Sequence, residues 1–235
     1  MRNQVCHLKF FEEQLYDSVH LIYLAENHSD FGANKFNYYY YHTLCRSSVL
    51  STMLLFESAA NCCIDSININ DKFTSEQIKE IDRYDILSKF KFILKEINPN
   101  QVMNKGCSEV QKIRELQQVR NNYVHPKVNK SEWVKNYDDT WSADFGETQY
   151  LKIPNQMHKW TTKHAISALK AANDFFNLFF LELCELDSNT VCGLLLENKQ
   201  VTIPFDAYVG VDFIRMLDKA SLEYDLDFKF IGKKS

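Results

Sequence analysis

The sequence predicts a mainly α protein: an antiparallel helical bundle of four to five long helices with a small α+β appendage at the C-terminus. Two observations predict this fold class. Glycine and proline are scarce, with 6 and 4 in a chain of 235 residues, so few positions interrupt a helix. Long segments also carry apolar residues three or four positions apart, which is the period of one helix face. We therefore divide the chain into a bundle of residues 1–187 and an appendage of residues 188–235.

The composition is typical of a folded cytoplasmic protein, with 45% apolar and 25% charged residues. The 17 Phe and 12 Tyr predict an aromatic core, and the seven cysteines, irregularly spaced, are expected to be reduced thiols without a cofactor. No apolar run approaches the roughly 18 residues of a membrane span, and the first residues do not resemble a signal peptide. The net charge of −4 excludes a globally basic nucleic-acid binder, so such a role would need a local basic patch.

Two long helices are expected first, at about residues 8–27 and 36–67. Each segment has apolar residues at helical spacing, which predicts one buried face. The second contains "LLFESAANCC", which is almost wholly apolar or small, so this helix should be central and covered on several sides. The spaced apolar residues are Leu8, Phe11, Leu15, Val19 and Ile22 in the first, and Val49, Met53, Phe56, Ala60 and Cys63 in the second.

Capping signals predict where the next helices begin. Thr74 with Gln77 fits a capping box, which would open a helical stretch. After a short interruption this stretch resumes over "DILSKFKFILKEI", residues 85–97. Ser108 with Gln111 fits a second capping box, which would open the helix "EVQKIRELQQVRNNYV".

The helix that follows Ser108 should end near Val124, because Pro126 disfavours helical geometry at His125. Residues 126–154 then predict a long connection with one short strand or hairpin, and a loop of this length is often functional. Its alternating Tyr150 and Ile153 are one sign of extended structure.

The C-terminal part predicts one more long helix, over residues 156–185, before the appendage. In the appendage, "VCGLLLENKQVTIPF" predicts two short strands around "ENKQ", and residues 206–224 predict a helix.

The stretch "RNNYVH" places three candidate catalytic residues, Arg120, Asn121 and His125, at the expected end of a helix. Asn121 and His125 are four residues apart and share a helix face, so Asn121 can orient the imidazole or hold a substrate oxygen. Arg120 and His125 are about 140° apart around a regular helix, so they share a face only if the helix unwinds near Pro126. A purely structural interpretation remains open, because Arg and His also complement the dipole of a helix C-terminus.

This Arg–polar–His pattern, late in a helical bundle, resembles the HEPN domain family. The segments "LLFESAANC" and "LSKFKFIL" also look like HEPN helices, and the resemblance covers roughly residues 8–186. It implies a ribonuclease that acts as a homodimer, in which two His and two Arg form one composite site. It also implies a toxin–antitoxin, antiviral defence or RNA-processing role, with a cognate inhibitor protein as a further partner. Lys127 departs from HEPN toxins that carry a Tyr two residues after the motif His as a target for adenylylation.

The implied chemistry is RNA transesterification without a metal. One histidine can remove the proton of a 2′-hydroxyl and a second can protonate the 5′-oxygen that leaves. Arginine can hold the phosphate and stabilise the charge of the transition state. The expected products are a 2′,3′-cyclic phosphate and a 5′-hydroxyl.

Four further residues are candidates for substrate binding: Arg114, Tyr123, Lys127 and Lys130. Between residues 105 and 130, six basic residues stand against two acidic ones, in a chain that is acidic overall. Such a patch suits contacts with a phosphate backbone, although lysines on a solvated helix face give the same pattern. Tyr123 can stack on a base or belong to the core.

Glu57 interrupts an apolar helix and is the candidate supporting residue. If buried, its carboxylate needs a partner, and an ion pair with Arg120 or Arg114 would orient a guanidinium. Exposure on the polar face of the helix is the alternative. For the whole chain, the competing hypothesis is a non-catalytic HEPN-like bundle that binds a partner protein or a nucleotide.

Overall fold

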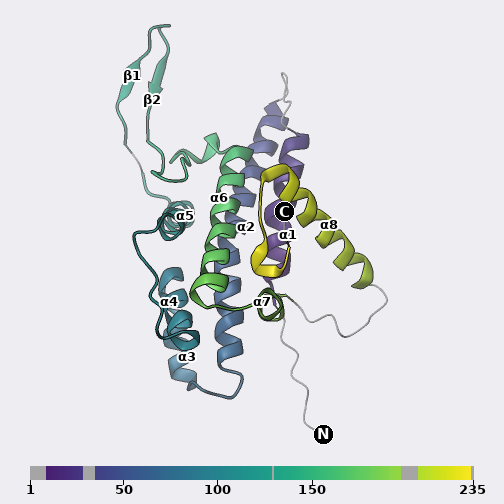
Figure 1. The fold of residues 1–235 in the computed structure, drawn as a ribbon. Helices are drawn as coiled ribbons and strands as arrows, with labels where there is room; N and C mark the ends of the chain where they lie inside the picture. The colour runs from purple at the N-terminus through teal and green to yellow at the C-terminus, as the bar shows by residue number, and fades with distance from the viewer. Residues whose placement is uncertain (1–8, 29–34, 129, 197–205, 234–235) are drawn as a thin grey trace.

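A computed structural model describes residues 9–28, 35–128, 130–196 and 206–233 (Figure 1). Within these residues the protein is mainly α, with eight α-helices packed together and one two-stranded antiparallel hairpin. The predicted helical fold class is therefore confirmed. The elements are α1 (Phe11–Asn27), α2 (Lys35–Ile67), α3 (Ser75–Asp82), α4 (Ile86–Ile97), α5 (Ser108–Val124), β1 (Trp133–Lys135), β2 (Trp141–Ala143), α6 (Thr162–Phe176), α7 (Ser188–Leu195) and α8 (Asp206–Tyr224).

The long helix α2 lies at the centre of the bundle, as predicted. It packs mainly against α1 and α6 and also contacts α4, α5 and α7 (Figure 1). Phenylalanine rings fill the space between these helices, with centroid distances of 5.1 Å for Phe56 and Phe176 and 4.7 Å for Phe90 and Phe179. The predicted aromatic core is confirmed, and edge-to-face or tilted ring pairs of this kind add to the free energy of burial. The fully or nearly fully buried rings of this core include Phe11, Phe56, Phe90, Phe175, Phe176, Phe179, Phe180, Phe228, Phe230 and Trp160.

One of the two predicted capping boxes is present. The Thr74 N–H donates to Gln77 Oε1 and the Gln77 N–H donates to Thr74 Oγ1, at 2.8 and 3.2 Å. The box predicted for Ser108 and Gln111 is wrong, because the cap of α5 is Cys107 and Ser108 is already the first helical residue. The Cys107 side chain forms no capping hydrogen bond, so the start of α5 has no capping box.

The last long helix is shorter than the predicted 156–185. A 3₁₀ turn covers Met157–Lys159, α6 begins at Thr162, and its end continues as π-helix over Asn177–Leu183. The start of α6 is fixed by Trp160, which is buried and donates its indole N–H to the Pro154 carbonyl at 2.7 Å. Because a buried indole needs a hydrogen-bond acceptor, the chain turns here before the helix begins.

The connection between α5 and α6 contains the predicted hairpin, which projects from the bundle (Figure 1). Its register pairs Trp133 with Ala143 and Lys135 with Trp141. The alternating Tyr150 and Ile153 are not part of a strand pair of this hairpin, since the segment around them turns back onto α5.

The predicted α+β character of the appendage is wrong for its first strand, since residues 188–195 form α7. Asp187 caps this helix by accepting the N–H groups of Asn189 and Thr190 at 2.9 and 3.1 Å. The predicted second strand and its turn fall on residues 197–205, outside the described part of the chain. The predicted helix over 206–224 is confirmed as α8, and Phe230 beyond it packs against Phe176 in the bundle core at 5.3 Å.

One of the described helices, over Phe36–Ile67 in α2, is long and apolar enough to cross a membrane by length and composition. Its most apolar 18-residue window has a mean hydropathy of 1.2, and 61% of that window is buried inside the protein. The central helix of a soluble bundle passes the same test, so the location of the protein stays a prediction.

Candidate functional site

The first three turns of α5 are held firmly in the bundle. Val110, Ile113, Leu116 and Val119 form its buried face. Glu115 is also buried, and its carboxylate accepts the N–H of Tyr150 at 2.9 and 3.0 Å and the N–H of Leu151 at 2.9 Å. This carboxylate therefore ties the segment before α6 to α5, because charge-assisted hydrogen bonds are among the stronger ones.

The last turn of α5 has the opposite character, because Arg120, Asn121 and His125 are all exposed. The helix ends at Val124, as predicted, and the N–H of His125 donates to the Asn121 carbonyl at 2.8 Å. His125 has φ −122° and ψ 67°, so the backbone leaves the helix at this residue.

Asn121 contacts the arginine of the motif. Its Oδ1 accepts a hydrogen bond from Arg120 Nη1 at 3.2 Å. We expected its side chain to orient the imidazole of His125, but that imidazole has no hydrogen bond to any described residue. Asn121 thus steadies the guanidinium, and the imidazole keeps both ring nitrogens available for a substrate or a partner.

A cavity of about 470 Å³ opens beside Arg120, between α2, α5 and the turn that joins α3 to α4. Its volume lies in the usual range of small-molecule sites, about 300–1,000 Å³. Met53, Phe56 and Ile113 contribute apolar walls, and Arg120 lies on its lining. The motif therefore adjoins a hollow of ligand size.

Glu57 also lines this cavity, but its ion pair differs from the expected one. Its Oε2 lies 2.9 Å from Lys89 Nζ, which also donates to Asn61 Oδ1 at 3.2 Å. Lys89 is 4% exposed, and a buried ammonium group requires a compensating charge. Glu57 therefore pairs with Lys89 on α4, and the expected link to Arg120 or Arg114 is wrong.

The four substrate-binding candidates fall in different surroundings. Tyr123 is half-buried, and its ring lies 6.3 Å from that of Trp160, so the core interpretation of this residue gains support. Arg114 is half-buried, whereas Lys127 and Lys130 are exposed. Lys130 lines a second, more open hollow of about 480 Å³ together with Asn122 and Asp144, between α5 and the hairpin. Arg120 and Lys130 therefore line different hollows.

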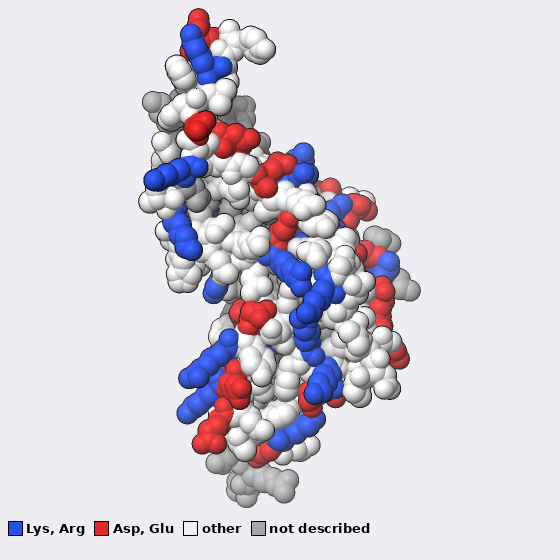
Figure 2. Space-filling model, turned by 90° about the vertical axis from the view of Figure 1, so that its left-hand side faces the viewer, with Lys and Arg blue, Asp and Glu red and all other residues white. Residues whose placement is uncertain are grey.

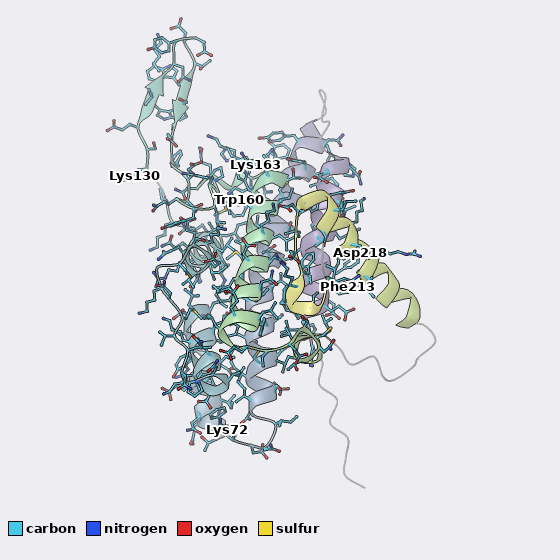
Figure 3. The ribbon with its side chains drawn as sticks, viewed as in Figure 1. Lys72, Lys130, Trp160, Lys163, Phe213 and Asp218 are labelled. Carbon is cyan, nitrogen blue, oxygen red and sulfur yellow. The ribbon has the colours of Figure 1, made fainter. Side chains whose placement is uncertain are left out.

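The local excess of positive charge is partly compensated by acidic residues nearby. Lys112 pairs with Asp174 at 3.4 Å, so its charge is partly compensated. Figure 2 shows Lys and Arg over the middle and lower part of the face formed by α3, α4, α5 and the hairpin, with Asp and Glu between them. Figure 3 shows Lys130 on the segment that leads from α5 to the hairpin. The basic groups are thus dispersed, and a bound phosphate backbone would need more than one contact point.

Sequence reasoning missed the residues that α3 and α4 contribute to the cavity. Arg83, Tyr84 and Asp85 lie in the turn between these helices, and Lys89 lies behind the cavity on α4. The signal for Lys89 was available, because it is three residues after Ile86 and four before Ile93, on the apolar face of the helix.

Two cysteines outside the candidate site, Cys45 and Cys184, are buried in the fold. Burial raises the pKa of the Cys45 and Cys184 thiols to about 12. The six described cysteines are free. No group of three or more His, Cys, Asp or Glu among the described residues is arranged to hold a metal ion.

Comparisons with protein-family models, with curated proteins and with solved structures find no match to this chain. The fold and site define the chain as a helical bundle with an exposed Arg–Asn–His cluster beside a cavity.

Proposed function

We propose that the protein is a metal-independent endoribonuclease that acts as a homodimer, with Arg120, Asn121 and His125 in a composite active site. The observation that carries this proposal is the exposure of Arg120 and His125, five residues apart at the end of a helix whose inner face is buried. The likeness of this cluster to the HEPN motif supports a ribonuclease. The hydrogen bond from Arg120 to Asn121 supports a guanidinium that is aimed before the substrate binds.

The reaction requires a base, an acid and an anion-binding group. In the dimer, one His125 takes the proton of the 2′-hydroxyl, whose oxygen attacks the phosphorus as the bond to the 5′-oxygen breaks. The His125 of the second copy gives a proton to that 5′-oxygen, and the two Arg120 side chains stabilise the added negative charge on phosphorus. The products are a 2′,3′-cyclic phosphate and a 5′-hydroxyl end. A single copy offers one imidazole and one guanidinium, so the second copy completes the site.

The proposed setting is the cytoplasm, as a toxin or antiphage component with a cognate inhibitor protein. An active ribonuclease of broad specificity would damage its own cell, so a partner that masks the exposed end of α5 is expected.

The test is RNA cleavage by the purified protein in the presence of EDTA. We expect cleavage of RNA but not of DNA or of RNA with 2′-deoxyribose at the cleaved position. His125→Ala should reduce the rate by about 10²–10⁴-fold, whereas His158→Ala, which removes another exposed histidine, should leave it unchanged. Cleavage that survives His125→Ala, or that requires a metal ion, would reject the proposal.

A second candidate function is partner binding without catalysis. The observation that favours it is the hairpin, where Trp133 and Trp141 are 68% and 59% exposed and Tyr137 is fully exposed. Exposed aromatic side chains are enriched in protein–protein contacts. This function predicts no cleavage by the free protein and the loss of a partner complex on changing Trp133→Ala and Trp141→Ala together.

A further inference from the structure

The cavity beside Arg120 combines apolar walls with a few charged groups. Met53, Phe56, Ile113 and Leu116 form an apolar interior, and the ring of Tyr84 lies at its edge. Apolar and aromatic walls with a few polar groups are typical of sites that enclose a flat ring system. A nucleobase fits this description, because its faces are apolar enough to stack and its edges form hydrogen bonds.

Glu57 is the polar group best placed to recognise the edge of a base. Lys89 binds its Oε2 from behind, and its Oε1 has no hydrogen bond to a described residue. The side chain is 38% exposed and lines the cavity, so it can be reached from within it. A carboxylate group without a proton is an acceptor of hydrogen bonds only, and the Lys89 ammonium group lies 2.9 Å from Oε2 of Glu57.

Asp85, the second carboxylate of the cavity, has another role. It caps α4, with Oδ1 accepting the Ser88 N–H at 3.2 Å and Oδ2 accepting the Ser88 hydroxyl. Although burial opposes it, these hydrogen bonds hold the pKa of Asp85 below its ordinary value. Asp85 therefore already accepts two hydrogen bonds at the start of α4, whereas Glu57 accepts one, from Lys89, and keeps more of its acceptor sites for a ligand.

An acceptor-only carboxylate distinguishes among the four bases. Guanine presents two adjacent donors, N1–H and the N2 amino group, on one edge. Adenine and cytosine present one amino group beside a ring acceptor, and uracil presents one N–H between two carbonyl groups. An acceptor facing the carboxylate is repelled, so guanine alone can form two parallel hydrogen bonds with it.

Two arginines line the same cavity and can bind the phosphates attached to such a base. Arg83 at the end of α3 and Arg120 on α5 both line it, and neither forms an ion pair with a described residue. Guanidinium groups bind phosphate through paired hydrogen bonds. A base seated in the cavity would therefore have its phosphates near Arg120.

We propose that this cavity is a guanine-binding subsite, in which Glu57 reads the N1–H and N2 amino edge of a guanine next to the cleaved phosphate. The subsite rests on the proposed ribonuclease function for its RNA substrate, and it assigns to that enzyme a preference for RNA with guanine beside the cut.

The test uses guanosine 3′,5′-bisphosphate and adenosine 3′,5′-bisphosphate as probes, titrated calorimetrically into the full-length protein. We expect guanosine to bind about ten- to a hundredfold more tightly, which is the usual discrimination of a paired hydrogen bond to a base. Glu57→Gln should abolish this preference. Leu54→Trp should weaken both probes, because Leu54 lies at the cavity and is 45% exposed, so a larger side chain obstructs the mouth without disturbing the core. Glu76→Gln, at an exposed position on α3, is the matched control and should change neither affinity.

The same titration with the His125→Ala variant separates this subsite from the proposed catalysis. Retained guanosine preference in that variant supports the subsite even if the wild-type protein cleaves no RNA. Equal affinities for the two probes, or no binding of either at millimolar concentration, overturn the subsite even if RNA is cleaved. If Glu57→Gln does not fold, as judged by circular dichroism, loss of guanosine binding in Leu54→Trp supports the assignment, and unchanged binding there overturns it.

Discussion

The C-terminal end of α5 and the N-terminal end of α6 each carry a histidine, and the two histidines have different surroundings. His125 lies beyond the last turn of α5, exposed and without a hydrogen bond from its imidazole to any described residue. His164 lies in the first turn of α6, where its Nδ1 accepts the N–H of Thr161 at 2.9 Å. One ring is committed to the fold, whereas the other has both nitrogens available.

This difference indicates which helix end holds the candidate site. At the start of α6, the indole N–H of the buried Trp160 and Nδ1 of His164 each form a hydrogen bond that stabilises the fold. At α5, Glu115 anchors the helix one turn earlier, so the last turn needs no further contacts to stay in place. An exposed imidazole next to an anchored helix is accessible to a substrate or to a second copy of the chain, whose contacts would then fix its orientation.

Among the variants that test this contrast in both activity and stability, Arg120→Ala is expected to have the largest effect. It tests whether the Arg120 side chain at the end of α5 serves function without contributing to stability. We expect the cleavage rate to fall by about 10²–10³-fold, because the change removes a guanidinium aimed at the developing negative charge. The free energy of unfolding should change by less than about 0.5 kcal/mol, because Arg120 is exposed and its hydrogen bond to Asn121 lies at the surface. Denaturant unfolding and RNA cleavage by the same preparation measure the two quantities.

Gln118→Ala is the control for that experiment, since Gln118 is exposed two residues before Arg120 and belongs to neither the cluster nor the cavity. Its cleavage rate and stability should match the wild type. A marked loss of stability in Arg120→Ala would indicate a structural role for the end of α5.

The next largest effect, on stability, is expected from Glu115→Ala, which removes the carboxylate that ties the segment before α6 to α5. Removal of the carboxylate leaves the buried N–H of Leu151 and that of Tyr150 without their acceptor, which costs about 2–4 kcal/mol of unfolding free energy. Glu109→Ala, in the first turn of the same helix, should cost under about 1 kcal/mol. Equal losses in the two variants, measured by urea unfolding, would contradict the anchoring role of Glu115.

Local signals in the sequence predicted most of the helices. Apolar spacing located α1 and α2, the Thr74–Gln77 box located α3, and Pro126 located the end of α5. The same signals failed over residues 188–195, because a short apolar run suits a strand and a buried helix equally. The Asp187 side chain stabilises the helix by capping its first turn. This interaction depends on side-chain geometry, so the apolar pattern did not reveal it.

The candidate site was predictable only where its parts are close in sequence. Arg120, Asn121 and His125 stand within six residues, so their common place at a helix end followed from the chain. The partner of Glu57 did not, because Lys89 is 32 residues away and reaches it only through the packing of α4 on α2. The cavity has the same origin, since three separate segments form its walls.

The smallest effect is expected at His164, and it depends on pH. Burial, with a contribution from Lys163, lowers the pKa of His164 below its ordinary value of 6.5. Above that value the ring is neutral in both the folded and the unfolded chain, so its contribution to stability is fully present. As the pH falls through 6.5 toward the lowered pKa, the unfolded chain binds the proton first and the stability declines. We expect this contribution to be about 1 kcal/mol, the usual size of a helix cap.

His164→Gln tests this pH dependence directly, because glutamine keeps an acceptor for the Thr161 N–H but does not titrate. Between about pH 7.5 and about pH 5, the variant should lose less unfolding free energy than the wild type, by about 1 kcal/mol. His158→Gln, at an exposed position in the preceding 3₁₀ turn, should lose as much as the wild type. If all three proteins show the same slope of stability against pH, His164 does not cap α6 as a neutral ring, and the contrast with His125 does not hold.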